Sequence, residues 1–323
     1  MLIRRTLLGA MLAVALAGCN GAAIESYSTS LAPERGAQAL PGHIYLFWGL
    51  AGEIFSRGLD GLAAKIRHRG VGASVHSMVE AGAVADRIVR RYRDDPSSAP
   101  VMLLGHSSGG DAIIAIAGKL KAAGVPVALA FGFDPTPVAG AIPSNIALFI
   151  NLYQATNLIG GGTAVAGPGF GGRLINVDLR ERREIVHITL DKNDAIHDLV
   201  VDKVVGVAAA ARARQEARAA PEPAARKPRS AHRPPPKPQE VLPLTMRYVV
   251  PSDVAIVLWD SAYAVTAGPD DTTEQIAAAH GVPAWAVAQI NGLNVDRPPQ
   301  PGQRLLIPRV AFSAQRVTGF PAR

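Results

Sequence analysis

A serine between two glycines is the first pattern in this sequence that could do chemistry. Residues 105–109 read Gly-His-Ser-Ser-Gly and follow the apolar run at residues 101–104. A serine in a sharp strand-to-helix turn is held in a strained backbone conformation, and small neighbours let the strand and helix approach each other. The apolar, helix-like residues 112–117 follow. The context therefore favours Ser107 as a nucleophile for acyl transfer over a chance occurrence of the pattern.

A serine nucleophile needs a base to take its proton and an acid to orient that base. In this kind of turn the partners follow in the chain order Ser, Asp, His. Asp134 comes directly after the apolar strand that we expect at residues 127–133. Because a strand that ends there places its last residue at the same edge as Ser107, we expect Asp134 to be the acid. The alternative is a turn-forming Asp before a proline.

Two histidines follow Asp134 and could be the base. Residues 185–190 read as the last strand of the sheet, which puts His187 inside that strand. His197 follows a short polar loop at residues 191–194 and opens the helix-like stretch at residues 198–211. A histidine after a strand, at the start of the last helix, suits the chain order. We therefore prefer His197 as the base and keep His187 as the alternative.

The developing negative charge of an acyl-transfer reaction needs backbone donors. One is the N–H of Ser108, the residue after the nucleophile, and the other comes from the loop after an early strand. Residues 48–52 form that loop, and we expect Leu50 to supply the donor. The alternative is that the glycines of this loop serve only a tight turn. The chemistry needs no cofactor and no metal, and we expect neither.

Apolar runs alternate with amphipathic segments through the first two thirds of the chain. This alternation predicts an α/β fold with a mostly parallel sheet and helices on both faces. The glycine-rich residues 159–172 break the pattern, and we expect a mobile surface loop near the site there. The expected strands are residues 43–50, 73–79, 101–106, 127–133 and 145–153, with a helix at 55–68.

The glycines of residues 49–52, the Ser107 turn, Asp134 and His197 make residues 40–207 resemble the α/β-hydrolase family. The likeness is nearest to its lipase and thioesterase branches, which implies an acyl ester or thioester substrate. The sequence departs from the family in having no long insertion after Asp134 that could form a full lid. The acid also follows the strand next after that of the nucleophile, as in some thioesterases.

The C-terminal region has a strand–helix–helix–strand pattern. A strand opens at residue 263, helices span 273–280 and 283–290, and a strand closes at 304–307. This βααβ unit, with its Gly-Val, Asn-Gly-Leu and Leu-Leu-Ile-Pro segments, resembles a LysM domain, although extra residues separate Gly268 from Asp271. The resemblance implies binding of peptidoglycan or another N-acetylglucosamine polymer. The implied glycan-binding residues are Gly268, Asp271, Thr272, Asn291, Gly292 and Leu293, with capping and turn geometry as their alternative role.

The N-terminus reads as a secretory signal. Arg4 and Arg5 precede a short apolar stretch at residues 7–16, and Leu-Ala-Gly-Cys ends at Cys19, the one cysteine of the chain. This ending resembles a bacterial lipobox, which implies cleavage before Cys19 and lipidation of its sulfur. Asn20 after the cysteine is compatible with sorting to the outer membrane, facing the periplasm. The alternative is an ordinary signal peptide in which Cys19 is incidental.

The positive charge is not spread over the chain. Residues 208–240 carry eight Lys and Arg against three acids, and with Arg4 and Arg5 they account for the whole net charge of +7. The remaining sequence is near neutral, so we expect no nucleic-acid partner. The expected division of the chain is a signal peptide at 1–18, a tether at 19–39, a hydrolase-like domain at 40–207, an Ala/Arg/Pro-rich linker at 208–245, a LysM-like domain at 246–312 and a tail at 313–323.

These features together predict a lipid-anchored serine hydrolase of the cell envelope that acts on an ester or thioester and is targeted to peptidoglycan. One alternative is a non-catalytic tether between membrane and peptidoglycan on a hydrolase fold. Another is an esterase that acts on modified peptidoglycan. The sequence does not distinguish a substrate or an acyl-chain length.

Overall fold

The computed structural model describes residues 39–50, 52, 57–157, 159–219, 239–294 and 296–310. The expected signal peptide, Cys19 and the C-terminal tail lie outside these residues, as do nearly all of the tether and the centre of the expected linker. Within the described part of the chain, no helix is both long and apolar enough to cross a bilayer.

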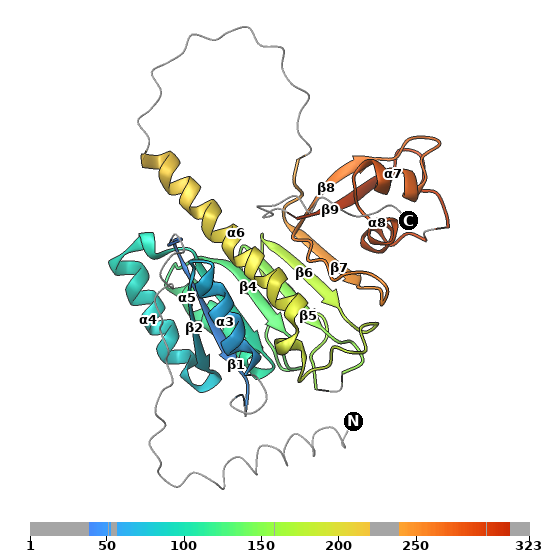
Figure 1. Cartoon of the computed structure of the whole chain (residues 1–323). Helices are drawn as coiled ribbons and strands as arrows, with labels where there is room; N and C mark the ends of the chain where they lie inside the picture. Colours follow the sequence, from blue (N-terminus) through green and yellow to red (C-terminus); the bar gives the residue numbers. More distant parts are fainter. Residues whose placement is uncertain are drawn as a thin grey trace, which may run out of the picture.

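Seven parallel strands form one sheet in the order β2-β1-β3-β4-β5-β6-β7, which confirms the expected parallel architecture (Figure 1). Because all strands run the same way, their carboxyl ends meet at one edge of the sheet, toward the bottom of Figure 1. The strands are β1 His43–Trp48, β2 Gly72–Ser77, β3 Val101–His106, β4 Val127–Phe133, β5 Leu148–Tyr153, β6 Arg173–Asp178 and β7 Leu244–Val249.

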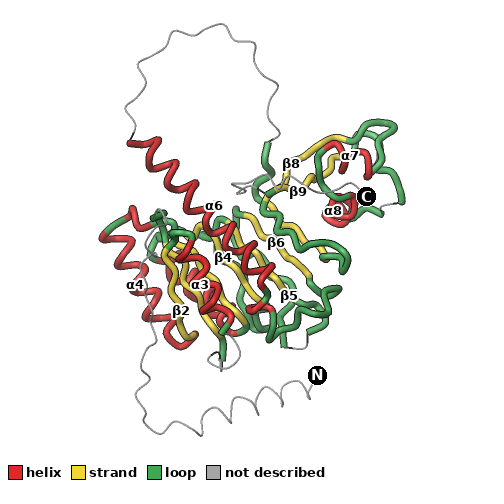
Figure 2. The backbone as a smooth tube through the Cα atoms, viewed as in Figure 1, coloured by secondary structure: helices red, strands yellow, loops and turns green. Residues whose placement is uncertain are grey.

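Helices cover both faces of the sheet. Helices α3 (Gly58–His68) and α6 (Asp194–Ala219) bury their apolar residues in one core, and α4 (Ala81–Asp94) and α5 (Ser108–Ala122) bury theirs in a second. Figure 2 shows α3 and α6 crossing in front of the sheet. Successive strand residues point to opposite faces, so each central strand contributes to both cores. This two-sided burial is why these strands are continuous apolar runs.

The strand expected at residues 185–190 is absent. These residues lie in a turn, and the sixth strand of the sheet is β6, at the end of the glycine-rich stretch. β6 lies between β5 and β7, so both of its edges are already paired. Val186 and Ile188 are 41% and 50% exposed, so their apolar pattern does not reflect burial in the sheet. The prediction was wrong because an apolar alternation says nothing about which edge is free.

The seventh strand spans the boundary that we expected between the linker and the C-terminal domain. α6 continues to Ala219, past the expected start of the linker at residue 208, and β7 begins at Leu244 and pairs with β6 from end to end. Residue 246, the expected start of the C-terminal domain, lies inside β7. The alternation of buried Met246 and Tyr248 with exposed Arg247 suits an edge strand. Residues 179–243 thus include the crossover from β6 through α6 to β7.

The C-terminal residues form the expected βααβ unit. Strands β8 (Ser261–Thr266) and β9 (Arg304–Arg309) pair antiparallel, and helices α7 (Thr273–Ala279) and α8 (Ala284–Asn291) lie between them in the chain. A small apolar core of this unit includes Ile276, Val287, Leu305 and Ile307.

The βααβ unit is attached to the edge of the large sheet at β7. The Gln289 side chain in α8 accepts a hydrogen bond from the Val249 N–H at 2.7 Å and donates to the Val249 carbonyl at 3.2 Å. The Trp259 ring centroid lies 4.8 Å from that of Tyr248 and 5.3 Å from that of Trp285. The Gln289 amide thereby satisfies the backbone N–H and carbonyl that Val249 presents at the open edge of the sheet. The aromatic rings join the two units in one apolar contact.

Ion pairs reinforce this attachment. Lys203 in α6 contacts Asp260, just before β8, at 2.6 Å, and both side chains are buried. Glu240 contacts Arg173 in β6 at 3.0 Å and Arg309 in β9 at 2.6 Å. A buried pair of this kind is costly to break, because removing one partner leaves the other charge buried alone. The two units are therefore held by more than the connecting chain.

Candidate active site

Ser107 lies at the turn between β3 and α5 with φ 56° and ψ −130°, a conformation that a non-glycine residue rarely adopts. A Cβ atom on Gly105 would lie 2.1 Å from the Gly109 carbonyl oxygen, and one on Gly109 would lie 2.1 Å from the Phe47 carbonyl oxygen. Only glycine fits at either position. Such a strained residue costs about 1–3 kcal/mol and is characteristic of functional sites.

Asp134 lies at the end of the adjacent strand β4, on the same edge of the sheet as Ser107. The Ser107 N–H donates to the Phe133 carbonyl at 2.9 Å, which ties the turn to the end of β4. The Asp134 N–H donates to the Leu152 carbonyl of β5 at 2.7 Å. The Asp134 side chain is buried, and its Oδ2 accepts a hydrogen bond from Nδ1 of His187 at 2.8 Å.

The structure pairs Asp134 with His187, the alternative base, and not with the preferred His197. His187 lies in the turn after β6, and its side chain is 13% exposed. His197 is buried in α6, and its Nε2 bonds the Asp191 carbonyl at 2.6 Å. α6 starts at Asp194, earlier than expected, so His197 is already helical and turned into the protein. The expected position of the base is therefore corrected from the helix to the preceding turn.

His106, in the Gly-His-Ser-Ser-Gly pattern, supports the His187 turn, and the sequence reasoning missed it. Its Nε2–H donates to the His187 carbonyl at 2.8 Å, and the two ring centroids lie 4.9 Å apart. Burial has the largest effect on the pKa of His106 and lowers it from the usual histidine value. The ring is therefore neutral at pH 7. A polar residue at the end of an entirely buried strand was the available signal.

Asn157, in the loop after β5, also contacts the acid and was missed. Its Nδ2 donates to Oδ2 of Asp134, the oxygen that faces His187. The other carboxylate oxygen, Oδ1, is buried and has no hydrogen-bond partner among the described residues. A Cβ atom on Gly160 would lie 2.0 Å from Oδ1, so the backbone at Gly160 closes over the carboxylate. A polar residue just past a strand end at this edge could have indicated the contact.

The two expected backbone donors, Leu50 and Ser108, lie next to each other. The Leu50 N–H donates to Oγ of Ser108 at 2.9 Å, and that hydroxyl donates to Sδ of Met78 at 3.0 Å. A Cβ atom on Gly49 would lie 3.0 Å from the Ser108 nitrogen and 2.8 Å from its Oγ. The glycine therefore allows the loop after β1 to approach Ser108. In this structure the Leu50 amide is engaged by the Ser108 hydroxyl.

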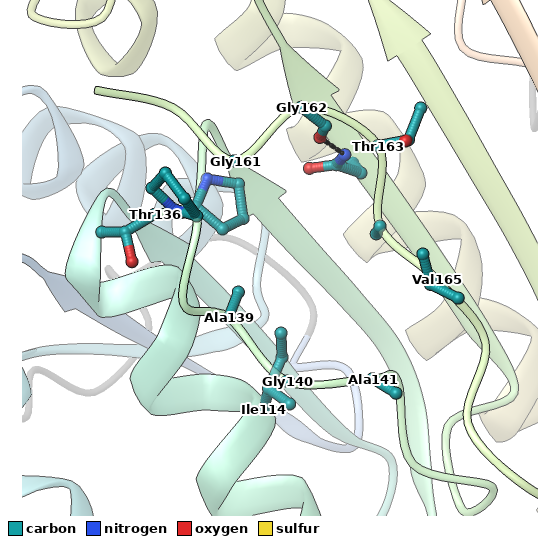
Figure 3. A pocket seen from close by; sticks show the side chains of 13 residues that line it. Ile114, Thr136, Ala139, Gly140, Ala141, Gly161, Gly162, Thr163 and Val165 are labelled. Carbon is teal, nitrogen blue, oxygen red and sulfur yellow. Dashed lines mark hydrogen bonds between the residues drawn. The ribbon is translucent and has the colours of Figure 1, made fainter. Parts of the chain in front are cut away.

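A cavity of about 240 Å³ lies beside the loop that follows Asp134 (Figure 3). Thr136 and residues 161–165 are among its lining residues, whereas Ser107 and His187 are not, so we do not assign the acyl-transfer chemistry to it. Nowhere in the described ranges do three His, Cys, Asp or Glu side chains gather in a way that could hold a metal ion.

The glycine-rich segment that walls this cavity is tied to the sheet. Nδ2 of Asn151 donates to the Gly162 carbonyl at 2.8 Å, and the Ala164 N–H donates to Oδ1 of Asn176 at 2.8 Å. Asn151 and Asn176 are buried neighbours on β5 and β6 and bond each other at 2.9 Å. Residues 159–172 are exposed or half-buried, as expected for a surface loop, and buried asparagines of the sheet bond part of their backbone. The expected mobility of this loop stays a prediction.

The first group of expected glycan-binding residues shapes the loop before α7. Oδ2 of Asp271 accepts a hydrogen bond from the Gly268 N–H at 2.6 Å. Thr272 is the N-cap of α7 and forms a capping box with Gln275. These contacts are those of a turn and a helix cap. They agree with the alternative structural role of Gly268, Asp271 and Thr272 and leave their glycan contacts a prediction.

The second group holds the end of α8 against β9. Nδ2 of Asn291 donates to the Leu306 carbonyl at 2.8 Å, and its Oδ1 accepts from the Leu306 N–H at 2.7 Å. Gly292 ends α8 with φ 64°, and Leu293 packs against the core of the βααβ unit. The Asn291 amide is thus occupied by backbone contacts. Glycan binding by these residues also stays a prediction.

Comparisons with known proteins identify one part of the chain. Residues 265–308 match the LysM domain family. No curated protein matches the chain. Solved structures that it resembles include an esterase domain from Rhodothermus marinus, at 12% identity over 42% of this chain and 78% of that one, with a TM-score of 0.29. A lidless α/β serine hydrolase from Xanthomonas campestris is 14% identical over 44% and 76%, with a TM-score of 0.30.

A thioesterase domain, NocB from the nocardicin cluster, is 18% identical over 36% of this chain and 72% of that one, with a TM-score of 0.27. Similarities at this level carry no argument about activity. The α/β-hydrolase character of the large sheet rests on its own parallel strand order and on the strained serine between β3 and α5.

Proposed function

We propose that this chain, with an α/β-hydrolase sheet and a LysM domain at residues 265–308, is a serine hydrolase of the cell envelope that cleaves ester or thioester bonds. The observation that carries the proposal is the position of strained Ser107 at the end of β3, next to the end of β4, where buried Asp134 bonds His187 at 2.8 Å. A nucleophile, a base and an orienting acid are the parts that acyl transfer to serine requires.

In the proposed acylation step, Nε2 of His187 takes the proton of the Ser107 hydroxyl. The serine oxygen then attacks the substrate carbonyl and forms a tetrahedral intermediate. Asp134 holds Nδ1 of His187, which fixes the ring and stabilises the imidazolium. Collapse of the intermediate breaks the bond to the alcohol or thiol, which leaves with the proton from His187, and an acyl group stays on Ser107.

In the deacylation step, a water molecule gives a proton to His187 and attacks the acyl carbonyl. The second tetrahedral intermediate releases the carboxylic acid, and Ser107 recovers its proton. The Ser108 N–H and the Leu50 N–H stabilise the negative oxygen in both steps. For this to occur, the Leu50 amide must exchange its bond to the Ser108 hydroxyl for one to the substrate oxygen.

The other modules supply location in this proposal. LysM domains bind peptidoglycan or N-acetylglucosamine polymers, and residues 265–308 would bind such a polymer here. The lipobox-like sequence ending at Cys19 would anchor the chain to a membrane, facing the periplasm and most simply at the outer membrane. The hydrolase would then act between membrane and cell wall.

Labelling with a fluorophosphonate probe tests the enzymatic proposal. The probe forms a covalent bond only with an activated serine, so the wild-type chain should be labelled and Ser107→Ala should not. Ser97→Ala is the matched control and should be labelled like the wild type, because Ser97 is exposed and precedes β3, away from the carboxyl ends of the strands. Absence of labelling in the wild type, or equal labelling of Ser107→Ala, would reject the serine mechanism.

One observation favours a second candidate, a non-catalytic tether between membrane and wall. The Leu50 amide is bonded to the Ser108 hydroxyl, so one expected donor is occupied. A tether would be pulled down with peptidoglycan but would hydrolyse no ester. An esterase acting on wall ester groups would instead release acetate from acetylated peptidoglycan.

A further inference from the structure

Exposed aliphatic side chains are concentrated on loops at the carboxyl edge of the parallel sheet. Their exposed fractions range from 41% to 73%, although residues of this kind are usually buried. They come from loops that lie far apart in the sequence. We call this group the apolar rim, and it comprises Leu50, Val79, Ile159, Val186 and Ile188.

Two contacts to Ser108 place one side of the apolar rim beside the nucleophile. The Leu50 N–H bonds Oγ of Ser108 at 2.9 Å. That hydroxyl also bonds Sδ of Met78 at 3.0 Å, and Val79 is the next residue. Ser108 follows Ser107 directly. The loops after β1 and β2 therefore bring Leu50 and Val79 to the same side of Ser107.

Contacts to Asp134 and His187 place the other side of the apolar rim beside the proposed acid and base. Val186 and Ile188 are the two chain neighbours of His187. The Ile159 N–H bonds Oδ1 of Asn157 at 3.1 Å, and Asn157 bonds Asp134. Every member of the apolar rim is thus at most two residues from a group that touches the turn, the acid or the base.

Grouped, exposed apolar side chains at one place mark a binding site for an apolar partner. The loops that carry the apolar rim also carry His187 and the Leu50 donor, and two of them contact Ser108, the residue after Ser107. The occupant should therefore be part of the reacting molecule. A glycan would require polar groups at these positions, whereas an aliphatic acyl chain gains from contact with them. This favours a lipid-like substrate over the acetyl esters of a cell wall.

We propose that the apolar rim binds the aliphatic acyl chain of the substrate, so that the site prefers esters of medium and long acyl chains over acetyl esters. The inference rests on the proposed serine hydrolase function and specifies its substrate class. Full burial of one methylene group raises the equilibrium constant for transfer out of water about fourfold. On an open rim that buries only one side of the chain, kcat/KM should rise about twofold for each methylene group that reaches it.

A chain-length series tests the inference. We would measure kcat/KM for the p-nitrophenyl esters of acetate, butyrate and octanoate on the full-length protein, below the concentrations at which the octanoate forms micelles. The octanoate-to-acetate ratio should be well above one in the wild type. It should fall about fivefold in Val79→Ser and in Ile188→Ser, because a polar hydroxyl replaces apolar contact area.

Leu242→Ser is the matched control, because Leu242 is 59% exposed but lies just before β7, away from the site. Its ratio should equal that of the wild type, and thermal melts would show whether each variant is folded. A wild-type enzyme that cleaves acetate with no gain for octanoate would overturn the inference and leave the proposed function standing. So would equal ratios in all four proteins. Failure to cleave any ester or to bind the fluorophosphonate would overturn both.

Discussion

Hydrogen bonds to a single carboxylate oxygen organise the site at the scale of residues. Oδ2 of Asp134 accepts from Nδ1 of His187 and from Nδ2 of Asn157, while His106 holds the main chain of His187. A carboxylate that accepts a hydrogen bond from Nδ1 favours the tautomer with Nδ1 protonated, which leaves Nε2 for the proton transfer of the proposed mechanism. His187, the proposed base, is therefore oriented by groups from three different elements.

Separate replacement of the two histidines tests the assignment of the base. His187→Ala should lower kcat/KM at least about 10⁴-fold, since it removes the proton acceptor. His197→Ala should keep most of the activity but lower the free energy of unfolding by about 1–3 kcal/mol, because the Asp191 carbonyl loses its partner. Ester hydrolysis and urea unfolding would measure the two effects. The reverse pattern would restore His197 as the base.

Close approach of backbones positions the site at the scale of elements. β3 meets α5 at Gly105, α5 meets β1 at Gly109, and the loop after β1 meets Ser108 at Gly49. At each point a side chain of any size would collide with backbone or with the Ser108 hydroxyl. The glycines therefore set the distance between the nucleophile and the expected backbone donors.

Gly49→Ala tests this positioning. The added methyl group would lie 2.8 Å from Oγ and 3.0 Å from the nitrogen of Ser108, so the loop after β1 must move away. We expect kcat to fall about 10²–10³-fold, as for the loss of one oxyanion donor, with little change in KM. Gly61→Ala, at an exposed position of α3 where a Cβ atom meets nothing within 4 Å, should leave kcat unchanged. Equal kcat in both variants would exclude the Leu50 loop from the reaction.

Hydrogen bonds between two histidines and a serine join β1 and β2. Oγ of Ser74 bonds Nε2 of His43 and Nε2 of His76, each at 2.8 Å. Burial, followed by the charge of Arg91, lowers the pKa of His43 to about 3, and burial lowers that of His76 to about 4. The folded protein therefore keeps both rings neutral at pH values where the unfolded chain, with histidine pKa values near 6.5, has bound protons.

Stability should consequently fall as the pH drops from about 6.5 toward about 4, because the unfolded state binds more protons over this range. Urea unfolding at pH 7.0, 6.0 and 5.0 would show the loss. In the double variant His43→Gln and His76→Gln the loss over the same interval should be clearly smaller, whatever its stability at pH 7. An identical pH dependence of stability in the wild type and the double variant would refute the role of His43 and His76 in this loss.

At the scale of the whole molecule, the βααβ unit packs against the edge strand β7 of the large sheet. β7 follows α6 in the chain after residues 220–243, yet it pairs with β6 and carries the contacts to α8 and Trp259. The buried Lys203–Asp260 pair adds a second connection. The βααβ unit is therefore attached through β7, a strand of the large sheet, and does not depend on a free spacer.

Cleavage of the chain between residues 220 and 238 tests this attachment. We would insert a specific protease site there and cut the native protein. The two fragments should stay together in size-exclusion chromatography and separate only in denaturant, because β7 remains in the sheet. Uncut protein with the same insertion is the control. Separation of the fragments under native conditions would mean that the βααβ unit is held by the connecting chain alone.

Local patterns in the sequence were sufficient for strands β3 and β4, for Ser107 and Asp134 at the same edge of the sheet, and for the βααβ unit. Apolar runs, glycines in a sharp turn and helix caps depend on neighbouring residues, so they can be recognised in one dimension. Tertiary structure alone decided that His187 faces Asp134, that Asn157 bonds the same oxygen, and that β7 completes the sheet. Each of these depends on which elements meet in space after a long crossover, and local periodicity carries no information on that.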